Sequence, residues 1–273
     1  YNSNVFADGA EEKPFSGATL RFFGILGKRF FSDPSMTWDL NYSLSWEEIL
    51  DLEDGRLVQH SITGPLSFFP GKGVFRITPS VSYQQIFTKN FRVVPGVQLS
   101  YESDRKPKGP GLSYFFGRNI PIDSEFSYLK GNIHQAQAFW KWPWGVRGNH
   151  RLFYTVVRFE SNPLPISGGT LPLQYNAHGP GYRFLSFAQS DWRHEGAISY
   201  LFKDYEGVTT PLGNKRNDQQ LAAFLRSSTP INRELDFFVN SSLIWNRSTI
   251  DVGEVDNRDF TQFVIYAGIA WKF

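Results

Sequence analysis

Apolar and polar side chains alternate at every second position along much of this chain of 273 residues. The clearest stretch runs from Thr37 to Glu47, and its apolar positions are Trp38, Leu40, Tyr42, Leu44 and Trp46. The residues between them are polar or charged. A period of two is the repeat of a β-strand, whose successive side chains point to opposite faces of a sheet. This stretch predicts a strand with one polar face and one apolar face that has tryptophan at both ends.

The same alternation recurs along the chain, and its interruptions divide the chain into about fourteen predicted strands. They are Tyr1–Phe6, Phe15–Leu26, Thr37–Glu48, Leu57–Phe69, Val74–Phe87, Phe91–Glu102, Gly111–Arg118, Ser127–Trp142, His150–Glu160, Gly181–Gln189, Glu195–Asp204, Gln219–Ser228, Arg233–Asn246 and Phe260–Phe273. No stretch approaches the roughly 18 consecutive apolar residues of a membrane-spanning helix. We therefore predict one all-β domain, residues 1–273, folded as a transmembrane antiparallel up-and-down β-barrel.

Three places depart from the simple alternation. Pro79 lies in the middle of a predicted strand, where the missing N–H predicts a bulge or a local weakness. Near His134 and Gln135 the apolar positions change parity, which predicts a bulge there. Over Arg151–Phe159 neither parity is mainly apolar.

The connections between the predicted strands differ in length in a regular way. If both termini are periplasmic, the periplasmic side receives the short connections Pro70–Gly73, Pro143–Gly148, Ser190–His194 and Thr229–Asn232. The outer side then receives the long connections Ala7–Pro14, Ser161–Pro180, Tyr205–Asp218 and Arg247–Asp259. Two connections do not fit, since Gly27–Met36 is long for a turn and Thr88–Asn90 is short for an outer loop. Short periplasmic turns and long outer loops are typical of bacterial outer-membrane barrels.

The composition agrees with this class and excludes some others. Aromatic residues make up 17% of the chain, enough to form the aromatic girdles found at the two membrane interfaces. The absence of cysteine excludes disulfides and thiolate metal sites. The formal charge is only +2, and basic residues are scattered among acidic ones, so no nucleic-acid partner is predicted. No metal-ligand or phosphate-loop spacing occurs, so we expect no cofactor.

The last predicted strand ends the chain on an apolar face. Its alternate residues are Phe263, Ile265, Ala267, Ile269, Trp271 and Phe273. This resembles the signal for insertion into the bacterial outer membrane, in which a terminal Phe and the apolar residues before it are read by the barrel assembly machinery. In that resemblance Ile269, Trp271 and Phe273 form the signal, and the outer membrane of a Gram-negative bacterium is the location. The chain opens without a charged and apolar leader, so we expect a signal peptide, with or without an upstream domain, to precede it.

The chain begins with Tyr1, Asn2, Ser3, Asn4 and Val5. This segment resembles the Tyr-Asp/Asn-Ser-Asn-Val segment that opens the barrels of surface lipoprotein assembly modifiers. In that family a periplasmic tetratricopeptide domain precedes a barrel of this size, and the barrel helps to move lipoproteins to the cell surface. The chain is similar in length and strand number to the small monomeric porins as well. The two resemblances imply different tasks for one architecture.

An enzyme that acts on membrane lipids would need a catalytic triad on the barrel wall. The outer-membrane phospholipase type requires His and Ser on one face of a strand, with Asn or Asp on the next strand. His60 and Ser61 are adjacent, so their side chains point to opposite faces. His134 shares its face with Lys130 and Asn132 but with no Ser. We therefore predict that the protein is not an enzyme.

The polar face carries most of the charged residues of the predicted strands. By parity the predicted lumen-lining charges are Arg21, Asp39, Glu47, Arg76, Arg92, Glu102, Lys130, Arg183, Lys203, Arg226, Glu234, Asp236 and Lys272. Basic residues outnumber acidic ones in this set, which predicts a slight preference for anions. The other interpretation is a plugged lumen, because bulky residues share the same parity and the loop Ser161–Pro180 is long enough to fold into the mouth. Those residues are Phe23, Phe115, Phe238 and Tyr266.

These observations leave three functions open. The first is a passive pore or an export conduit across the outer membrane. The second is a non-conducting structural or assembly subunit of an outer-membrane complex, and the third is a surface-lipoprotein translocation barrel. The predicted partners are outer-membrane lipid and lipopolysaccharide, the barrel assembly machinery, and other envelope proteins or lipoproteins.

Overall fold

The computed structural model describes residues 19–49, 56–71, 73–87, 89–103, 108–145, 147–166, 169–171, 173–188, 191–207, 215–248 and 259–271. Most of these residues form one antiparallel sheet. Its strands are β1 (Thr19–Asp33), β2 (Met36–Ile49), β3 (Arg56–Thr63), β4 (Leu66–Phe68), β5 (Val74–Ile86), β6 (Lys89–Glu102), β7 (Gly109–Pro121), β8 (Gly131–Trp144), β9 (Gly148–Phe159), β12 (Tyr175–Phe187), β13 (Arg193–Tyr205), β14 (Asn217–Pro230), β15 (Leu235–Ser248) and β16 (Phe260–Trp271). A small separate hairpin pairs β10 (Leu164–Ile166) with β11 (Gly169–Leu171), and a 3-10 helix, η2, spans Ser124–Leu129.

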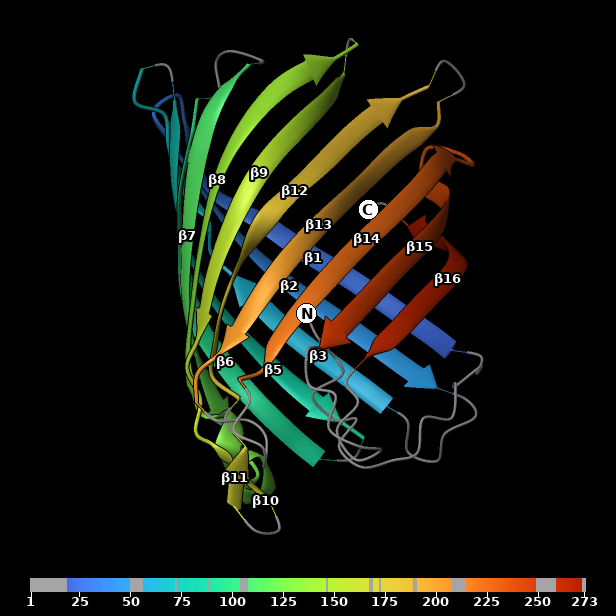
Figure 1. The fold of residues 1–273 in the computed structure, drawn as a ribbon. Coiled ribbons are helices and arrows are strands. Elements are labelled where there is room, and N and C mark those ends of the chain that lie inside the picture. The colour runs from blue at the N-terminus through green and yellow to red at the C-terminus, as the bar shows by residue number, and fades with distance from the viewer. Residues whose placement is uncertain are drawn as a thin grey trace.

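Each strand of the large sheet pairs with the next one along the chain, so the topology is up-and-down, as predicted. Strands β3 and β4 share one position, because both pair with β2 on one side and with β5 on the other. The sheet is strongly curved, and β1 and β2 pass behind β13–β15 in the view of Figure 1. The small hairpin β10–β11 lies beyond the ends of β6 to β9.

The connection between β1 and β2 is shorter than the sequence pattern predicted. The two strands pair up to Asp33 and Met36, with one register shift between Arg29 and Phe31, which leaves only Pro34 and Ser35 between them. Asp33 Oδ1 accepts hydrogen bonds from both the N–H and the hydroxyl group of Ser35, at 2.9 and 2.6 Å. An aspartate that bonds the backbone two residues ahead closes a tight turn locally. The prediction of a long connection over Gly27–Met36 was therefore wrong.

The weakness predicted at Pro79 falls on the neighbouring strand instead. Pro79 remains inside β5 and lies opposite Val97 of β6 without a shift in register. On its other side the pairing stops at Thr63 and resumes at Leu66, which separates β3 from β4. The carbonyl of Pro79 accepts the N–H of Gly64 at 2.9 Å, but Pro79 has no N–H to donate in return.

The bulge predicted near His134 and Gln135 is absent. Strand β8 pairs with both β7 and β9 through these residues without a register shift. The change of parity in the sequence came from two apolar residues before His134. Leu129 ends η2 and does not lie in the strand, and Ile133 lies on the opposite face of β8 from His134. His134, Ala136 and Trp140 lie on one face of a regular strand.

The two faces of the sheet differ in exposure. Large apolar side chains on the convex face are well exposed to solvent, among them Leu112, Leu152, Val156, Ile198, Phe263 and Ile265. Polar side chains on the concave face pack against one another and include buried members, such as Gln84, Asn119, Lys141, Lys203 and Asp218. The usual arrangement of a globular protein is thus inverted: oil-like groups face outward and polar groups face inward.

The two ends of the sheet carry connections of different length. At one end lie the connections 34–35, 69–73, 103–108, 145–147, 188–192 and 231–234. At the other end lie 50–55, 87–88, 122–130, 160–174, 206–216 and 249–259. We refer to these as the short-turn end and the long-loop end. Strand β16 finishes at the short-turn end, whereas β1 begins at the long-loop end. The predicted strand Tyr1–Phe6 lies outside the described residues.

The regular register of β8 can be tested by cross-linking, since the chain contains no cysteine of its own. Arg118 and Asn132 lie opposite each other on one side of the predicted bulge, and Ser113 and Gln137 lie opposite each other on the other side. Opposed strand residues bring their Cβ atoms within reach of a disulfide. We expect both double-cysteine variants to cross-link on oxidation, whereas Ser113→Cys with Ala138→Cys does not. A bulge at residues 134–135 would let only one of the two in-register pairs form, as judged by a non-reducing gel.

Candidate functional site

A group of charged side chains converges on the concave face near the short-turn end. Glu102 of β6 accepts a hydrogen bond from Lys141 Nζ of β8 at 2.6 Å, and its same oxygen lies 3.5 Å from a guanidinium nitrogen of Arg151 on β9. These residues come from strands two and three positions apart, so the curvature of the sheet brings them together. The guanidinium carbon of Arg151 also lies 4.0 Å from the ring centre of Phe139.

The charged group continues across the next three strands. Glu195 of β13 accepts hydrogen bonds from Arg183 of β12 and from Arg193, the latter at 3.2 Å. Arg226 of β14 lies opposite Glu195 in the register, and its guanidinium carbon lies 4.6 Å from the ring centre of Phe238. We call the whole set the inner basic cluster. Its members are Glu102, Lys141, Arg151, Arg183, Arg193, Glu195 and Arg226.

The inner basic cluster has five cations and only two carboxylates, so its net charge is positive. Lys141 has only 11% of its side chain exposed, whereas Arg183 and Arg193 each have 52% exposed. Among the described residues Arg226 takes part in no ion pair. The exposed guanidinium groups are therefore available to an anion, and arginine binds carboxylate and phosphate through two parallel hydrogen bonds.

The part of the concave surface formed by β1, β2, β4 and β5 has a smaller net charge than the inner basic cluster. Arg29 of β1 donates to Asp39 of β2 at 2.6 Å, and Arg76 of β5 donates to Ser67 of β4 at 2.9 Å. Together with Thr37 and other polar residues they line a shallow hollow. This region contributes two cations and one carboxylate to the same end of the sheet.

A second charged cluster lies on the concave face near the long-loop end, and its charged groups contact one another. Arg216 and Asp218 form a two-pronged ion pair, and both side chains are almost fully buried. Arg216 lies over the ring of Tyr205, and Lys203 lies over the ring of Tyr175. These groups bind one another and hold the ends of β12 to β14 together, so they are not presented to a ligand.

Most of the predicted lumen-lining residues fall on the concave face. They are Asp39, Glu47, Arg76, Arg92, Glu102, Arg183, Lys203, Arg226 and Asp236. Arg21 lies opposite Glu47 in the register, and its side chain is outside the described parts. Lys130 and Glu234 lie in connections and not in strands. Lys272 and the terminal Phe273 lie outside the described residues.

Four members of the inner basic cluster were missed by the sequence analysis. Lys141 was not included among the predicted lumen-lining charges. Arg151 lies where neither parity is mainly apolar, and Arg193 and Glu195 lie at the edge of a predicted turn. The face on which Arg151 lies can be assigned only from the neighbouring strands. Arg151 lies opposite both Lys141 and Arg183 once the register is known.

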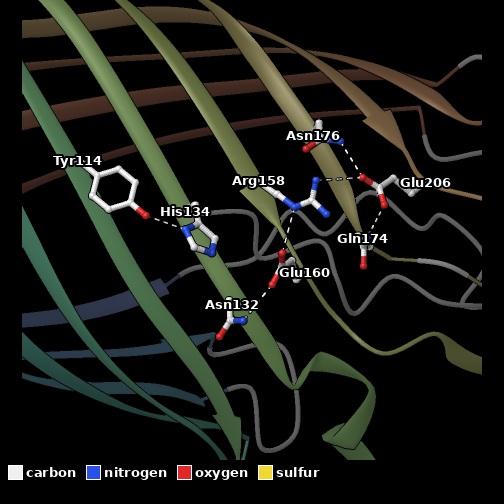
Figure 2. A network of polar contacts seen from close by, with 8 residues as sticks. All are labelled: Tyr114, Asn132, His134, Arg158, Glu160, Gln174, Asn176 and Glu206. Carbon is white, nitrogen blue, oxygen red and sulfur yellow. Dashed lines mark hydrogen bonds and ion pairs between the residues drawn. The ribbon is translucent and has the colours of Figure 1, made fainter.

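The convex face carries a polar network near the long-loop end, shown in Figure 2. Arg158 of β9 donates to Glu160 at 3.0 Å and lies 3.5 Å from Glu206. Asn132 donates to Glu160 at 2.9 Å, and Asn176 donates to Glu206 at 2.9 Å. This network forms a polar border where the exposed apolar surface ends.

Two histidines, His134 and His178, lie beside this border and are paired with tyrosines, and His60 on β3 is paired in the same way. The hydroxyl groups of Tyr42, Tyr114 and Tyr154 lie 2.6 to 2.8 Å from Nδ1 of His60, His134 and His178, respectively. Figure 2 shows one of these pairs, Tyr114 with His134, just inside the polar network. Tyrosine and histidine have an apolar body and a polar tip, which suits them to a boundary between oil and water.

Comparison with models of protein families, with curated proteins and with solved structures finds no match. Within the described part of the chain no helix is long and apolar enough to cross a membrane. No group of three or more His, Asp or Glu residues that could hold a metal ion occurs among the same residues.

The polar network predicts a pH effect at Glu160. Hydrogen bonds from Asn132 and then from Arg158 lower the pKa of Glu160 below its ordinary value of 4.5. A carboxylate with a lowered folded-state pKa stabilises the fold above pH 4.5, and this contribution is lost as the pH falls through the lowered pKa. We expect Glu160→Gln to lower the denaturant midpoint at pH 7 and to have no effect once wild-type Glu160 is protonated. A difference that persists unchanged at pH 2 contradicts this assignment.

Proposed function

We propose that the curved sheet closes into a β-barrel in the outer membrane of a Gram-negative bacterium and acts as a passive pore or export conduit that favours anions. The observation that carries the proposal is the difference between the two faces. The convex face is apolar and exposed, as a lipid-facing wall requires, and the concave face carries a net positive charge. The long-loop end is then the outer side, and the short-turn end is periplasmic.

The apolar surface has the height of a membrane. On β8 it extends from His134 at the polar border to Trp144 at the short-turn end. These ten residue steps of about 3.3 Å, tilted by about 40°, give a height of about 25 Å. Exposed aromatic residues mark its edge at the short-turn end on several strands, namely Trp38, Tyr101 and Trp144. An aromatic border of this kind is typical of the interface between lipid and water.

Antiparallel closure of the sheet needs one further strand between its two edge strands. Strands β1 and β16 both run from the long-loop end to the short-turn end, so pairing them directly would make a parallel contact. One further strand between them restores antiparallel pairing all around and brings the number of strand positions to an even value, as bacterial barrels prefer. The predicted strand Tyr1–Phe6 is our candidate. Both faces of β1 are exposed, with Phe22 at 58% and Phe23 at 59%, as expected where one neighbour is lacking.

The C-terminal strand supports the same location. Ile269 projects from the convex face and is 63% exposed, and Trp271 lies opposite Leu235 on β15. The barrel assembly machinery is therefore the partner that we propose for this strand, and lipid and lipopolysaccharide are those proposed for the convex face.

Anion preference can be measured in planar bilayers. We expect the wild-type protein to conduct and to pass chloride more readily than potassium. Removing two exposed charges with Arg183→Gln and Arg226→Gln lowers the chloride-to-potassium permeability ratio by about twofold or more, because one charge acting across about 10 Å of water contributes about 0.4 kcal/mol, a factor of about two. Arg158→Gln on the convex face is the control and leaves the ratio unchanged. Clear cation selectivity, or no conductance at all, contradicts the proposal; the second result is what a structural subunit gives.

Lipid contact can be measured separately by reversible folding into vesicles. Leu152 is 55% exposed near the middle of the convex face. Leu152→Arg is expected to lower the free energy of unfolding by about 2 to 4 kcal/mol, because a charge would face hydrocarbon. Gln98→Arg places the same group on the concave face and is expected to change it by less than about 1 kcal/mol. Equal costs for the two variants mean that the convex face does not meet lipid.

A further inference from the structure

Arg151 of the inner basic cluster is held by a stack of two other residues. The ring of Phe139 lies against Gly111 of β7, so closely that a Cβ atom at Gly111 would come within 2.1 Å of the ring. Gly111 and Phe139 lie directly opposite each other in the register. The guanidinium carbon of Arg151, on the other neighbouring strand, lies 4.0 Å from the ring centre. The missing Cβ of the glycine leaves room for the ring, and the ring contacts the arginine.

The same arrangement occurs a second time on the far side of the cluster. The ring of Phe238 lies against Gly268 of β16, and a Cβ atom there would come within 2.8 Å of it. Phe238 and Gly268 are again directly opposed. The guanidinium group of Arg226, on the other neighbouring strand, lies 4.6 Å from the ring centre. Two independent sets of strands thus build one motif, which we call the Gly–Phe–Arg stack.

We propose that the two Gly–Phe–Arg stacks position Arg151 and Arg226 as a binding site for small solutes that carry a phosphate or carboxylate group. This inference rests on the proposed function and identifies the class of solute that the pore prefers. An arginine stacked on an aromatic face has fewer conformations to lose when it binds an anion. Arg226 takes part in no ion pair among the described residues, so its guanidinium can meet the two oxygens of one phosphate or carboxylate. Arg151 lies 3.5 Å from Glu102, and its remaining N–H groups can contribute to the same site.

The stacks also determine the space available for the solute. Phe238 was one of the residues predicted to plug a lumen, and its ring lies against Gly268 of the neighbouring strand. The ring of Phe139, on the same concave face, lies against Gly111. A side chain at either glycine would occupy the space that the ring now takes. The glycine and the ring together therefore set the height of the guanidinium group above the wall.

Phe153 provides a matched control within the same sheet. Its ring lies against Gly181, which is directly opposite, and a Cβ atom there would come within 2.2 Å of it. Within the described residues no cation stacks on Phe153. A variant at this position removes a ring from a glycine without affecting an arginine.

The experiment compares Phe139→Leu with Phe238→Leu, combined in one protein, against Phe153→Leu and wild type. All three proteins have the same charge, and heat-modifiable migration on a gel checks that each one is folded. The probe is inorganic phosphate, added to block the chloride current of single channels in a planar bilayer. We expect the half-blocking phosphate concentration to rise about fivefold in the double variant, as expected for the loss of two weak cation–π contacts, and to stay at the wild-type value in Phe153→Leu.

Each result decides between the explanations. An unchanged block in the double variant, or an equal rise in Phe153→Leu, overturns the positioning of the arginines by the stacks. A wild-type channel that conducts chloride but is not blocked by phosphate overturns the proposed solute class alone. A wild-type protein that passes no current overturns the proposed function itself.

Discussion

The structure depends on one constraint, the pairing of every strand with its neighbours while successive side chains point to opposite faces. Backbone N–H and C=O groups that enter lipid must find partners within the protein, because hydrocarbon offers none. An antiparallel sheet satisfies them sideways and leaves both faces free to take any side chain. The chain uses this freedom to place large apolar groups on the convex face and charged groups on the concave face. Curvature then turns the concave face into a place where residues from distant strands meet.

The strands could be predicted from sequence because their signal is local. Alternation over five or more residues identified most of the strands, and tryptophans at both ends of the stretch from Trp38 to Trp46 indicated the apolar face. The errors arose where a decisive interaction lies outside the local pattern. The tight turn at Pro34 and Ser35 depends on a single side chain, Asp33. The split between β3 and β4 depends on a proline in the strand opposite.

The candidate site was less accessible to sequence analysis than the fold. Arg183 and Arg226 were identified by parity, since their strands alternate clearly. Lys141 and Arg151 were not, because their own strands gave no consistent parity and their positions follow from the register with neighbours. The contacting residues of the Gly–Phe–Arg stacks are 12 to 30 positions apart in the sequence, and the two stacks span 40 and 42 positions. A pattern read along one strand contains no information about such contacts.

The central claim is that the concave face meets water and the convex face meets lipid, and a cysteine scan along β15 in lipid vesicles tests it most directly. Residues 239 to 243 cover both faces and include polar Ser241 on the convex side, which composition alone would assign to water. The account predicts that a water-soluble maleimide labels cysteine at Asn240 and Ser242 and spares cysteine at Val239, Ser241 and Leu243. Uniform labelling of all five positions, or labelling at Ser241 equal to that at Ser242, would contradict it.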